Sequence, residues 1–191
     1  MNLRSRLSVL ALAATAAVAS APSFAADYSL AFQGVTFEMS IIDSDTFNLT
    51  MLNTDAAGGN WSGVTNLNAF QIGDIGTFTG ATATGPGGFV NISKELNAGG
   101  CDGGGGGALR LCFAGLAAVA PSLSWDIDVT GGALDVSSLG PHLKVRFGDA
   151  THDKVGDLLS QNIPAVPEPE SYALMLAGLA VVSVFARRRK V

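Results

Sequence analysis

Few residues of this 191-residue chain have the types and spacing that catalysis requires. There are two histidines: His142 follows Pro141, and His152 lies in the run Asp149-Ala-Thr-His152-Asp153. In a serine hydrolase such a histidine is the general base for a nucleophile, yet neither residue neighbours a G-x-S-x-G motif. We therefore expect no catalysis by this chain. A hydrolase that depends on His142 or His152 is kept as the last of three hypotheses.

Two pairs of aspartates have a spacing that suits cation binding. Side chains two positions apart in an extended chain share one face, so Asp43 and Asp45 place two carboxylates about 7 Å apart, as do Asp126 and Asp128. With loop carbonyls such a pair can hold calcium, but no D-x-D-x-D-G loop or glycine-aspartate nonapeptide repeat accompanies them. We favour solubilising surface acids and expect no cofactor, with Asp126 and Asp128 as the candidate ligands if a metal binds.

Both cysteines border a run of five glycines. Cys101 precedes Gly103 to Gly107 and Cys112 follows them. In an oxidising compartment this spacing indicates one local disulfide, which in the chain-entropy model contributes on the order of 3 kcal/mol for a loop of this size. A zinc-binding thiolate pair is the rival interpretation, but no histidine lies nearby. The glycines also lack the lysine and hydroxyl of a phosphate-binding loop.

The two tryptophans indicate where the core lies. Trp125 lies in Leu123-Ser-Trp-Asp-Ile-Asp-Val129, where the apolar residues share one face of a strand, so its indole is expected in the core. Trp61 follows Gly58-Gly59-Asn60 and is expected to open a strand. We favour packing at the rim of the core for Trp61, and stacking on a sugar ligand is the alternative.

Apolar residues at every second position dominate the middle of the chain. The strands that they predict must position the candidate residues named above. Short runs bounded by Gly, Asn, Asp or Pro predict strands, and no amphipathic helix of ordinary length competes. We predict an all-β domain, an antiparallel, jelly-roll-like β-sandwich. The expected strands contain residues 30–32, 35–41, 47–51, 64–72, 77–84, 89–96, 109–113, 123–129, 134–137 and 143–147.

Residues 26–165 form one domain by length, large enough for a hydrophobic core. This segment carries five basic and fourteen acidic side chains, a net charge of −9, whereas the whole chain has −5 because both ends are basic. An acidic surface repels phosphate backbones, so we exclude nucleic acid as a partner. The glycosylation sequons at Asn48, Asn60 and Asn91 are expected from composition alone.

The first 25 residues have the pattern of a secretory signal peptide. Arg4 and Arg6 form a basic start, residues 7–18 are apolar, and Ser23-Phe24-Ala25 is a small-x-small cleavage site. We predict a signal helix that is removed by cleavage between Ala25 and Ala26. The mature domain then lies outside the cytoplasm.

The last 26 residues, 166–191, have three parts. Pro167-Glu168-Pro169 is followed by an uncharged segment, residues 171–186, and then by four cations, Arg187, Arg188, Arg189 and Lys190. A 16-residue helix is about 24 Å long against roughly 30 Å of hydrocarbon, so we predict one short transmembrane helix whose flanking side chains extend its reach. The cations are expected to stay inside and stop the chain in the membrane.

This tail resembles the PEP-CTERM sorting signal of Gram-negative bacteria, in which Pro-Glu-Pro precedes a membrane span and an arginine-rich end. The resemblance implies that an exosortase, a membrane cysteine transpeptidase, cuts near residues 167–169, so that this chain is the substrate and its partner is the catalyst. The domain also resembles exported domains that occur together with this signal. The resemblance lies in Asn97-Ala-Gly-Gly-Cys101 and in residues 140–147 and 154–160. No activity is carried over from them.

The first hypothesis is an exported protein of the cell envelope or extracellular matrix, sorted and processed through its C-terminal anchor, with a structural or interaction role. It is expected to be anchored in the inner membrane before processing and to be periplasmic, on the outer envelope or extracellular afterwards. Expected partners are the membrane, an exosortase-type enzyme and exopolysaccharide. The second hypothesis is a surface module that binds carbohydrate, through Trp61, or calcium.

Overall fold

The computed structural model describes residues 27–92, 94–104, 110–137, 139–167, 175–176 and 178–179. The predicted signal peptide with Ala25 and Ala26, the motif residues Glu168 and Pro169, and the basic residues 187–190 lie outside the described residues. Most of the predicted span at 171–186 does so too. Within the described part, no helix combines the length and the apolar character that crossing a membrane requires.

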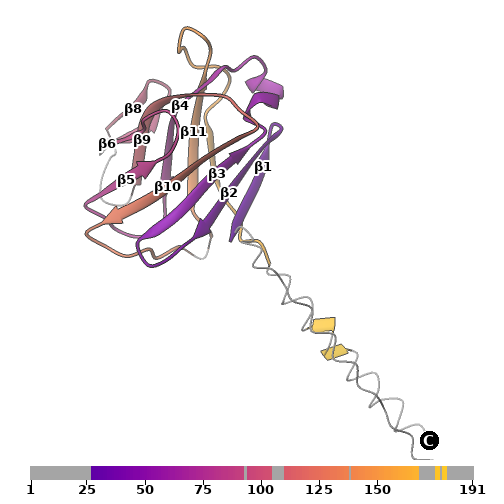
Figure 1. Cartoon of the computed structure of the whole chain (residues 1–191), viewed down its shortest axis with the longest axis vertical. Helices are drawn as coiled ribbons and strands as arrows, with labels where there is room; N and C mark the ends of the chain where they lie inside the picture. The colour runs from indigo at the N-terminus through magenta and orange to yellow at the C-terminus, as the bar shows by residue number, and fades with distance from the viewer. Residues whose placement is uncertain are drawn as a thin grey trace, which may run out of the picture.

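Two five-stranded antiparallel sheets face each other across a common core (Figure 1). Sheet A has the order β1-β2-β3-β10-β5, with β1 Tyr28–Phe32, β2 Val35–Ile41, β3 Thr46–Leu52, β10 Ser122–Thr130 and β5 Gly80–Thr84. Sheet B has the order β12-β11-β4-β9-β6, with β12 Leu159–Asn162, β11 His142–Gly148, β4 Asn66–Gly73, β9 Arg110–Ala118 and β6 Val90–Ile92. The predicted all-β class with antiparallel sheets is confirmed.

The chain alternates between the sheets after β3. The connection from β3 to β4 contains two 3₁₀ turns, η1 (Thr54–Ala56) and η2 (Gly59–Trp61). The chain then passes to sheet A for β5, to sheet B for β6 and β9, back for β10 and again to sheet B for β11. As a result the pairs β6–β9, β5–β10 and β4–β11 are nested in sequence.

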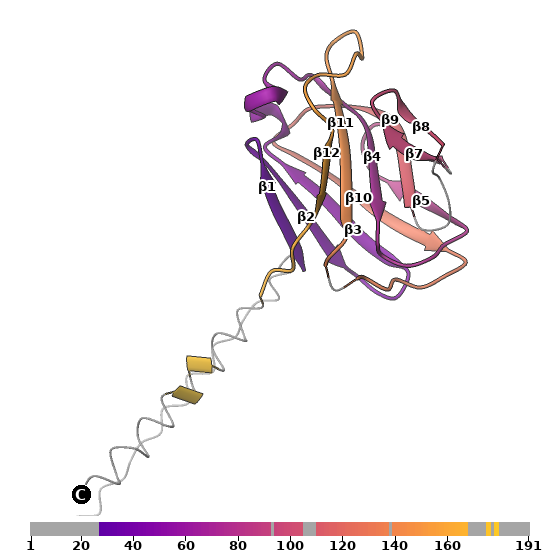
Figure 2. The ribbon, with the colours of Figure 1, turned by 180° about the vertical axis from the view of Figure 1, so that it is seen from behind.

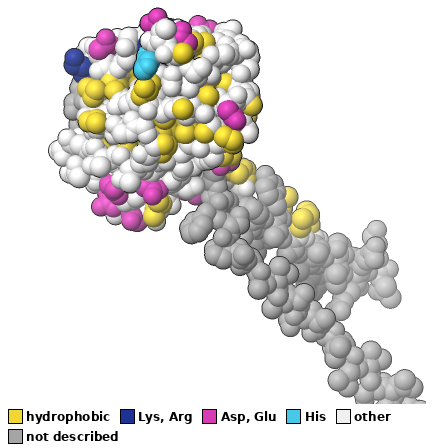
Figure 3. All heavy atoms as spheres, turned by 45° about the horizontal axis from the view of Figure 1, so that its top comes forward, with side chains coloured by type: hydrophobic (Ala, Val, Ile, Leu, Met, Phe, Trp, Pro, Cys, Tyr) yellow, Lys and Arg dark blue, Asp and Glu magenta, His cyan; other side chains and the backbone are white. Residues whose placement is uncertain are grey.

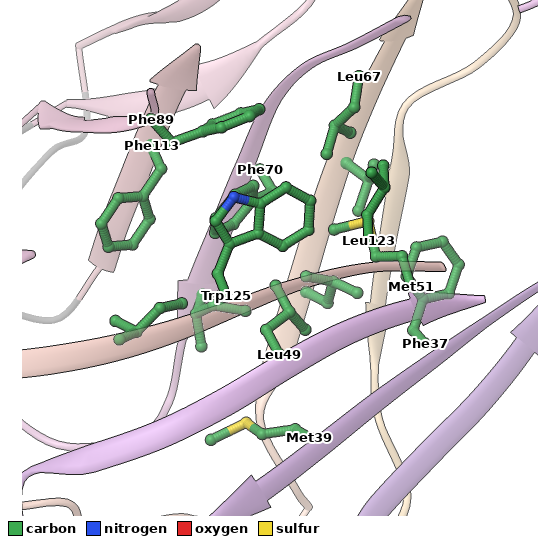
Figure 4. Packing of buried hydrophobic residues seen from close by; sticks show 14 of the residues in the cluster. Phe37, Met39, Leu49, Met51, Leu67, Phe70, Phe89, Phe113, Leu123 and Trp125 are labelled. Atoms are coloured by element: carbon green, nitrogen blue, oxygen red, sulfur yellow. The ribbon is translucent and has the colours of Figure 1, made fainter. Parts of the chain in front are cut away.

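The core is built from the inward-facing residues of alternating strands. In β10 the burial alternates residue by residue, and Trp125 is completely buried, as its phase predicts. Its ring centroid lies 5.1 Å from that of Phe70 on sheet B and 5.3 Å from that of Phe89, and its Nε1 donates to the carbonyl oxygen of Pro86 at 2.9 Å (Figure 4). Aromatic contacts of this kind join the two sheets and satisfy the indole donor.

The outer faces of the two sheets differ. Sheet A exposes a polar face on which Asn48 of β3 donates to Asp126 of β10 at 2.7 Å. Sheet B is covered in part by a hairpin of β7 (Glu95–Asn97) and β8 (Gly100–Gly103). Figure 2, which views the molecule from behind, shows this hairpin beside β9. Leu96 and Cys101 of this hairpin pack on Ala69 and Cys112 in a second, smaller apolar cluster.

The strand predicted at residues 134–137 is wrong. This segment belongs to no strand and instead runs across one end of the sandwich, between β10 and β11. The amide of Leu134 donates to Ser44 of sheet A's β2–β3 turn, and that of Asp135 donates to Ile75, beyond β4 of sheet B. The alternation of Leu134 and Val136 therefore reflects packing at the end of the core.

Candidate functional site

Residues 163–166, which directly precede Pro167, close one side of the sandwich, and we call them the clasp. Ile163 is completely buried, and its amide donates to the carbonyl oxygen of Pro141 at 2.8 Å. The chain then reaches the edge of sheet A, where Pro164 accepts from the amide of Ser29 at 3.0 Å. Because the clasp continues from β12, the edge strand of sheet B, and binds β1, the edge strand of sheet A, it joins the two sheets along these edges.

The clasp also brings the two ends of the domain together. Ala165 forms an antiparallel bridge with Tyr28, and the amide of Val166 donates to the carbonyl oxygen of Asp27 at 2.9 Å. Pro167, the first residue of the predicted motif, follows at once and is exposed. The mature N-terminus predicted at Ala26 and the sorting motif are thus attached to neighbouring points of the same edge, with no linker between the fold and Pro167.

Acidic residues surround this end of the sandwich. Asp43 and Asp45 lie in the β2–β3 turn and Asp128 lies near the end of β10, so all three are at the end where the chain leaves. Figure 3 shows a group of Asp and Glu side chains at the lower left edge of the domain. The pKa of Asp45 is raised, first by its hydrogen bond with Asp43 and then by the charges of Asp43 and Asp128.

The predicted disulfide between Cys101 and Cys112 is confirmed, with Cα atoms 5.8 Å apart. Cys101 lies in β8 and Cys112 in β9, so the bond fastens the β7–β8 hairpin to the outer face of sheet B. Gln71 of β4 supports the same contact, because its Oε1 accepts from the amide of Leu96 at 2.6 Å. The cysteines therefore have a structural role here.

A carboxylate of the hairpin binds the cations of sheet B. Glu95 Oε1 lies 2.6 Å from Lys144 Nζ of β11 and 2.7 Å from Arg110 Nη1 of β9. The hydrogen bond and the charge of Lys144 are the main causes that lower the pKa of Glu95, and Arg110 adds to them. Arg146 donates from Nε to the carbonyl oxygen of Ala98 at 3.0 Å, also on the hairpin.

Trp61 is not placed to be a ligand contact. It lies in η2, not at the start of a strand, and it is completely buried. Its ring packs against Phe147 with centroids 4.8 Å apart, and its Nε1 donates to the carbonyl oxygen of Asp157 at 2.9 Å. An indole with no exposed face cannot stack on a sugar, so this structure gives no support to the carbohydrate contact expected there.

The candidate metal ligands Asp126 and Asp128 point from the outer face of sheet A. Asp126 accepts from Asn48, and Asp128 accepts from Thr46 Oγ1 at 3.0 Å. Within the described ranges, no group of three or more His, Cys, Asp or Glu side chains could hold a metal ion. The pair thus takes part in a polar network of the sheet surface.

The two histidines lie at opposite ends of β11. His142 opens the strand, and its Nε2 is 3.1 Å from Ser160 Oγ of β12. His152 lies in the loop beyond the strand, where its carbonyl oxygen accepts from Asn68. A nucleophilic triad also needs a carboxylate on the second imidazole nitrogen, and the hydrogen bonds of the described residues include none for His142. Burial lowers the pKa of this histidine.

The fold and the clasp define the class of protein: an antiparallel β-sandwich whose C-terminal segment begins directly at a strand edge. Residues 165–190 match the family model for the PEP-CTERM protein-sorting motif, so the chain carries this motif, as its Pro167, Glu168 and Pro169 predict. The motif supports export and direction to the cell envelope through an exosortase. No curated protein and no solved structure matches the chain. The matched segment begins at Ala165, within the clasp.

Proposed function

We propose that this chain is an exported protein of the cell envelope or extracellular matrix, which is anchored by a short C-terminal helix and then processed near Pro167-Glu168-Pro169. The sandwich is the exported part and has a structural or interaction role, with no catalysis of its own. The observation that carries the proposal is the match of residues 165–190 to a sorting motif that starts at the edge of the sandwich.

The surface of the domain supports a structural or interaction role over sugar binding. Among the Phe, Tyr and Trp residues that the structure describes, Tyr28 and Phe32 are half-buried and the others are buried, so no fully exposed ring is present in this part as a platform for a sugar. The outer face of sheet A instead presents hydroxyl, amide and carboxylate groups that are hydrogen-bonded to one another, as Thr50 is to Asn48 and Ser124. Hydrated surfaces of this kind suit a domain displayed in a polysaccharide layer.

A matched pair of variants tests the proposal in a host that has the processing enzyme. Glu168→Ala changes the motif, whereas Glu170→Ala removes the same charge two residues later. We expect the Glu168→Ala chain to accumulate with its tail in the membrane fraction and the Glu170→Ala chain to be processed like the natural chain. Mass spectrometry of the mature protein identifies its N-terminal and C-terminal residues. Normal processing of Glu168→Ala would refute the proposal.

A further inference from the structure

The clasp fixes how close the sorting motif is to the sandwich. Val166 is bonded to Asp27, and Pro169 is only three residues further along the chain. At 3.3–3.6 Å per residue the motif ends no more than about 11 Å from the folded edge. A protein that binds residues 167–169 therefore has the end of the sandwich within reach of its surface.

The end of the sandwich next to Val166 has exposed apolar side chains around the clasp. Ile42 is 57% exposed, Leu139 is 75% exposed and Val166 is 38% exposed. Ile42 follows Ile41, whose amide is bound by the carboxylate of Asp27, and the carbonyl oxygen of Leu139 accepts from Asn162, the last residue of β12. The three side chains therefore flank the clasp from the β2–β3 turn, the β10–β11 connection and the clasp itself.

We define the exit surface as these three apolar residues together with the carboxylates of Asp27, Asp43, Asp45 and Asp128. None of the four carboxylates is in an ion pair within the described part of the chain, where Glu95 pairs with Lys144 and Arg110 on the outer face of sheet B. The exit surface thus combines exposed apolar area with unneutralised negative charge. A partner surface that is complementary to the exit surface is apolar at its centre and basic around it.

We propose that the exit surface docks on a basic surface of the processing enzyme, next to the site that holds Pro167-Glu168-Pro169. This inference rests on the proposed function, because it assumes that the motif is processed. The lipid surface is the less suitable occupant, since anionic headgroups attract basic segments and repel carboxylates. The sandwich is then part of the substrate that the enzyme recognises.

The test measures the half-time of tail removal by pulse-chase in the full chain. Ile42→Ser with Leu139→Ser removes exposed apolar contacts, and its matched control is Val90→Ser with Leu116→Ser, two exposed residues of β6 and β9 away from the exit. We expect the exit variant to be processed about three- to tenfold more slowly and the control to be unchanged. Equal half-times for the two variants would overturn the inference.

A charge reversal separates an enzyme partner from a lipid partner. Asp45→Lys should slow processing by a similar factor, whereas Asp55→Lys in η1, at the other end of β3, should not. Faster processing of Asp45→Lys would overturn the inference in favour of a lipid-facing surface. A ten-residue Gly-Ser insertion between Val166 and Pro167 should make processing insensitive to Asp45→Lys.

The two proposals fail in different ways. If Glu168→Ala blocks processing while the exit variants behave like the natural chain, the sorting function stands and docking by the exit surface is wrong. Processing that is unaffected by Glu168→Ala removes the sorting proposal itself. Thermal unfolding of each variant shows whether a slow half-time reflects loss of the fold.

Discussion

The amide of Val166 donates to the carbonyl oxygen of Asp27 at 2.9 Å, so the last residue before the Pro-Glu-Pro motif is bonded to the first described residue of the domain. The two predicted processing points, which are far apart in sequence, are therefore attached to neighbouring residues of the fold. Cleavage C-terminal to Val166 leaves this bond in place, whereas cleavage before Ile163 would remove the clasp. The position of the motif thus fits release of an intact domain.

The first prediction concerns the energy of the clasp. Ile163→Ala should destabilise the domain by about 2–5 kcal/mol, because Ile163 is completely buried and the smaller side chain leaves a cavity. Val166→Ala, in the same segment but partly exposed, should change the free energy of unfolding by no more than about 0.5 kcal/mol. Urea unfolding of both variants is the measurement. Equal effects would mean that the clasp is not anchored through Ile163.

A glycine beside the clasp gives a second prediction. Gly140 has a φ of +83°, and an added Cβ would overlap the carbonyl oxygen of Ile163. Gly140→Ala should therefore lower the free energy of unfolding by more than the roughly 1 kcal/mol of an ordinary backbone penalty. Gly63→Ala is the control, since Gly63 has a similar φ of +84° but open space around it. A smaller loss at Gly140 than at Gly63 would contradict the close packing of Gly140 against Ile163.

Much of the sandwich could be predicted from local pattern. In β2, β3 and β10 apolar and polar residues alternate, because one face of each strand packs on the core and the other faces solvent. This alternation is what predicts a strand from sequence. By contrast, β8 has the sequence Gly-Cys-Asp-Gly, and in β12 only Leu159 is buried. These strands exist because neighbouring strands bind their backbone, which leaves little trace in their own residues.

The candidate site was only partly predictable for the same reason. The motif at 167–169 and the disulfide follow from residues close in sequence. The clasp depends on pairing between Asp27 and Val166 at the two ends of the domain, and no local pattern encodes it. Trp61 shows the converse: its glycine-rich neighbourhood predicted a place at the rim of the core, but Phe32, Phe37 and Phe147 enclose its ring.

The third prediction concerns the disulfide. Replacing Cys101 and Cys112 together by serine should cost on the order of 3 kcal/mol in the chain-entropy model for a loop of this length. The hairpin should loosen first, because its remaining contacts with sheet B are mainly polar and only Leu96 adds buried apolar packing. Amide hydrogen exchange should show lost protection at Leu96 before Trp125. Simultaneous loss at both positions would indicate that the hairpin and the main core unfold as one unit.

The fourth prediction tests the core. Trp125→Ala should destabilise the domain by about 3–5 kcal/mol, since it removes a completely buried indole that packs against Phe70 and Phe89. Trp125→Phe keeps an aromatic ring but loses the hydrogen bond to Pro86, so its effect should be smaller. Denaturant unfolding measures both. A loss below about 1 kcal/mol for Trp125→Ala would contradict its place in the core.

The last prediction concerns the acid sensitivity of the ion pairs that Glu95 forms with Lys144 and Arg110. The pKa of Glu95 in the folded protein is held below its ordinary value of 4.5, mainly by Lys144 and less by Arg110. A lowered folded pKa means that the unfolded chain binds more protons, so the contribution of Glu95 is complete above about pH 4.5 and is lost as the pH falls through the folded pKa.

Lys144→Gln should therefore raise the pKa of Glu95 more than Arg110→Gln does, and Glu95→Gln should flatten the acid limb of the stability curve. NMR titration of the Glu95 carboxyl and urea unfolding from pH 3 to 7 measure the two effects. If Arg110→Gln had the larger effect, the dominant partner would be the more exposed cation. That result would mean that the hairpin is fastened chiefly to β9, where the disulfide already holds it, and not across the sheet to β11.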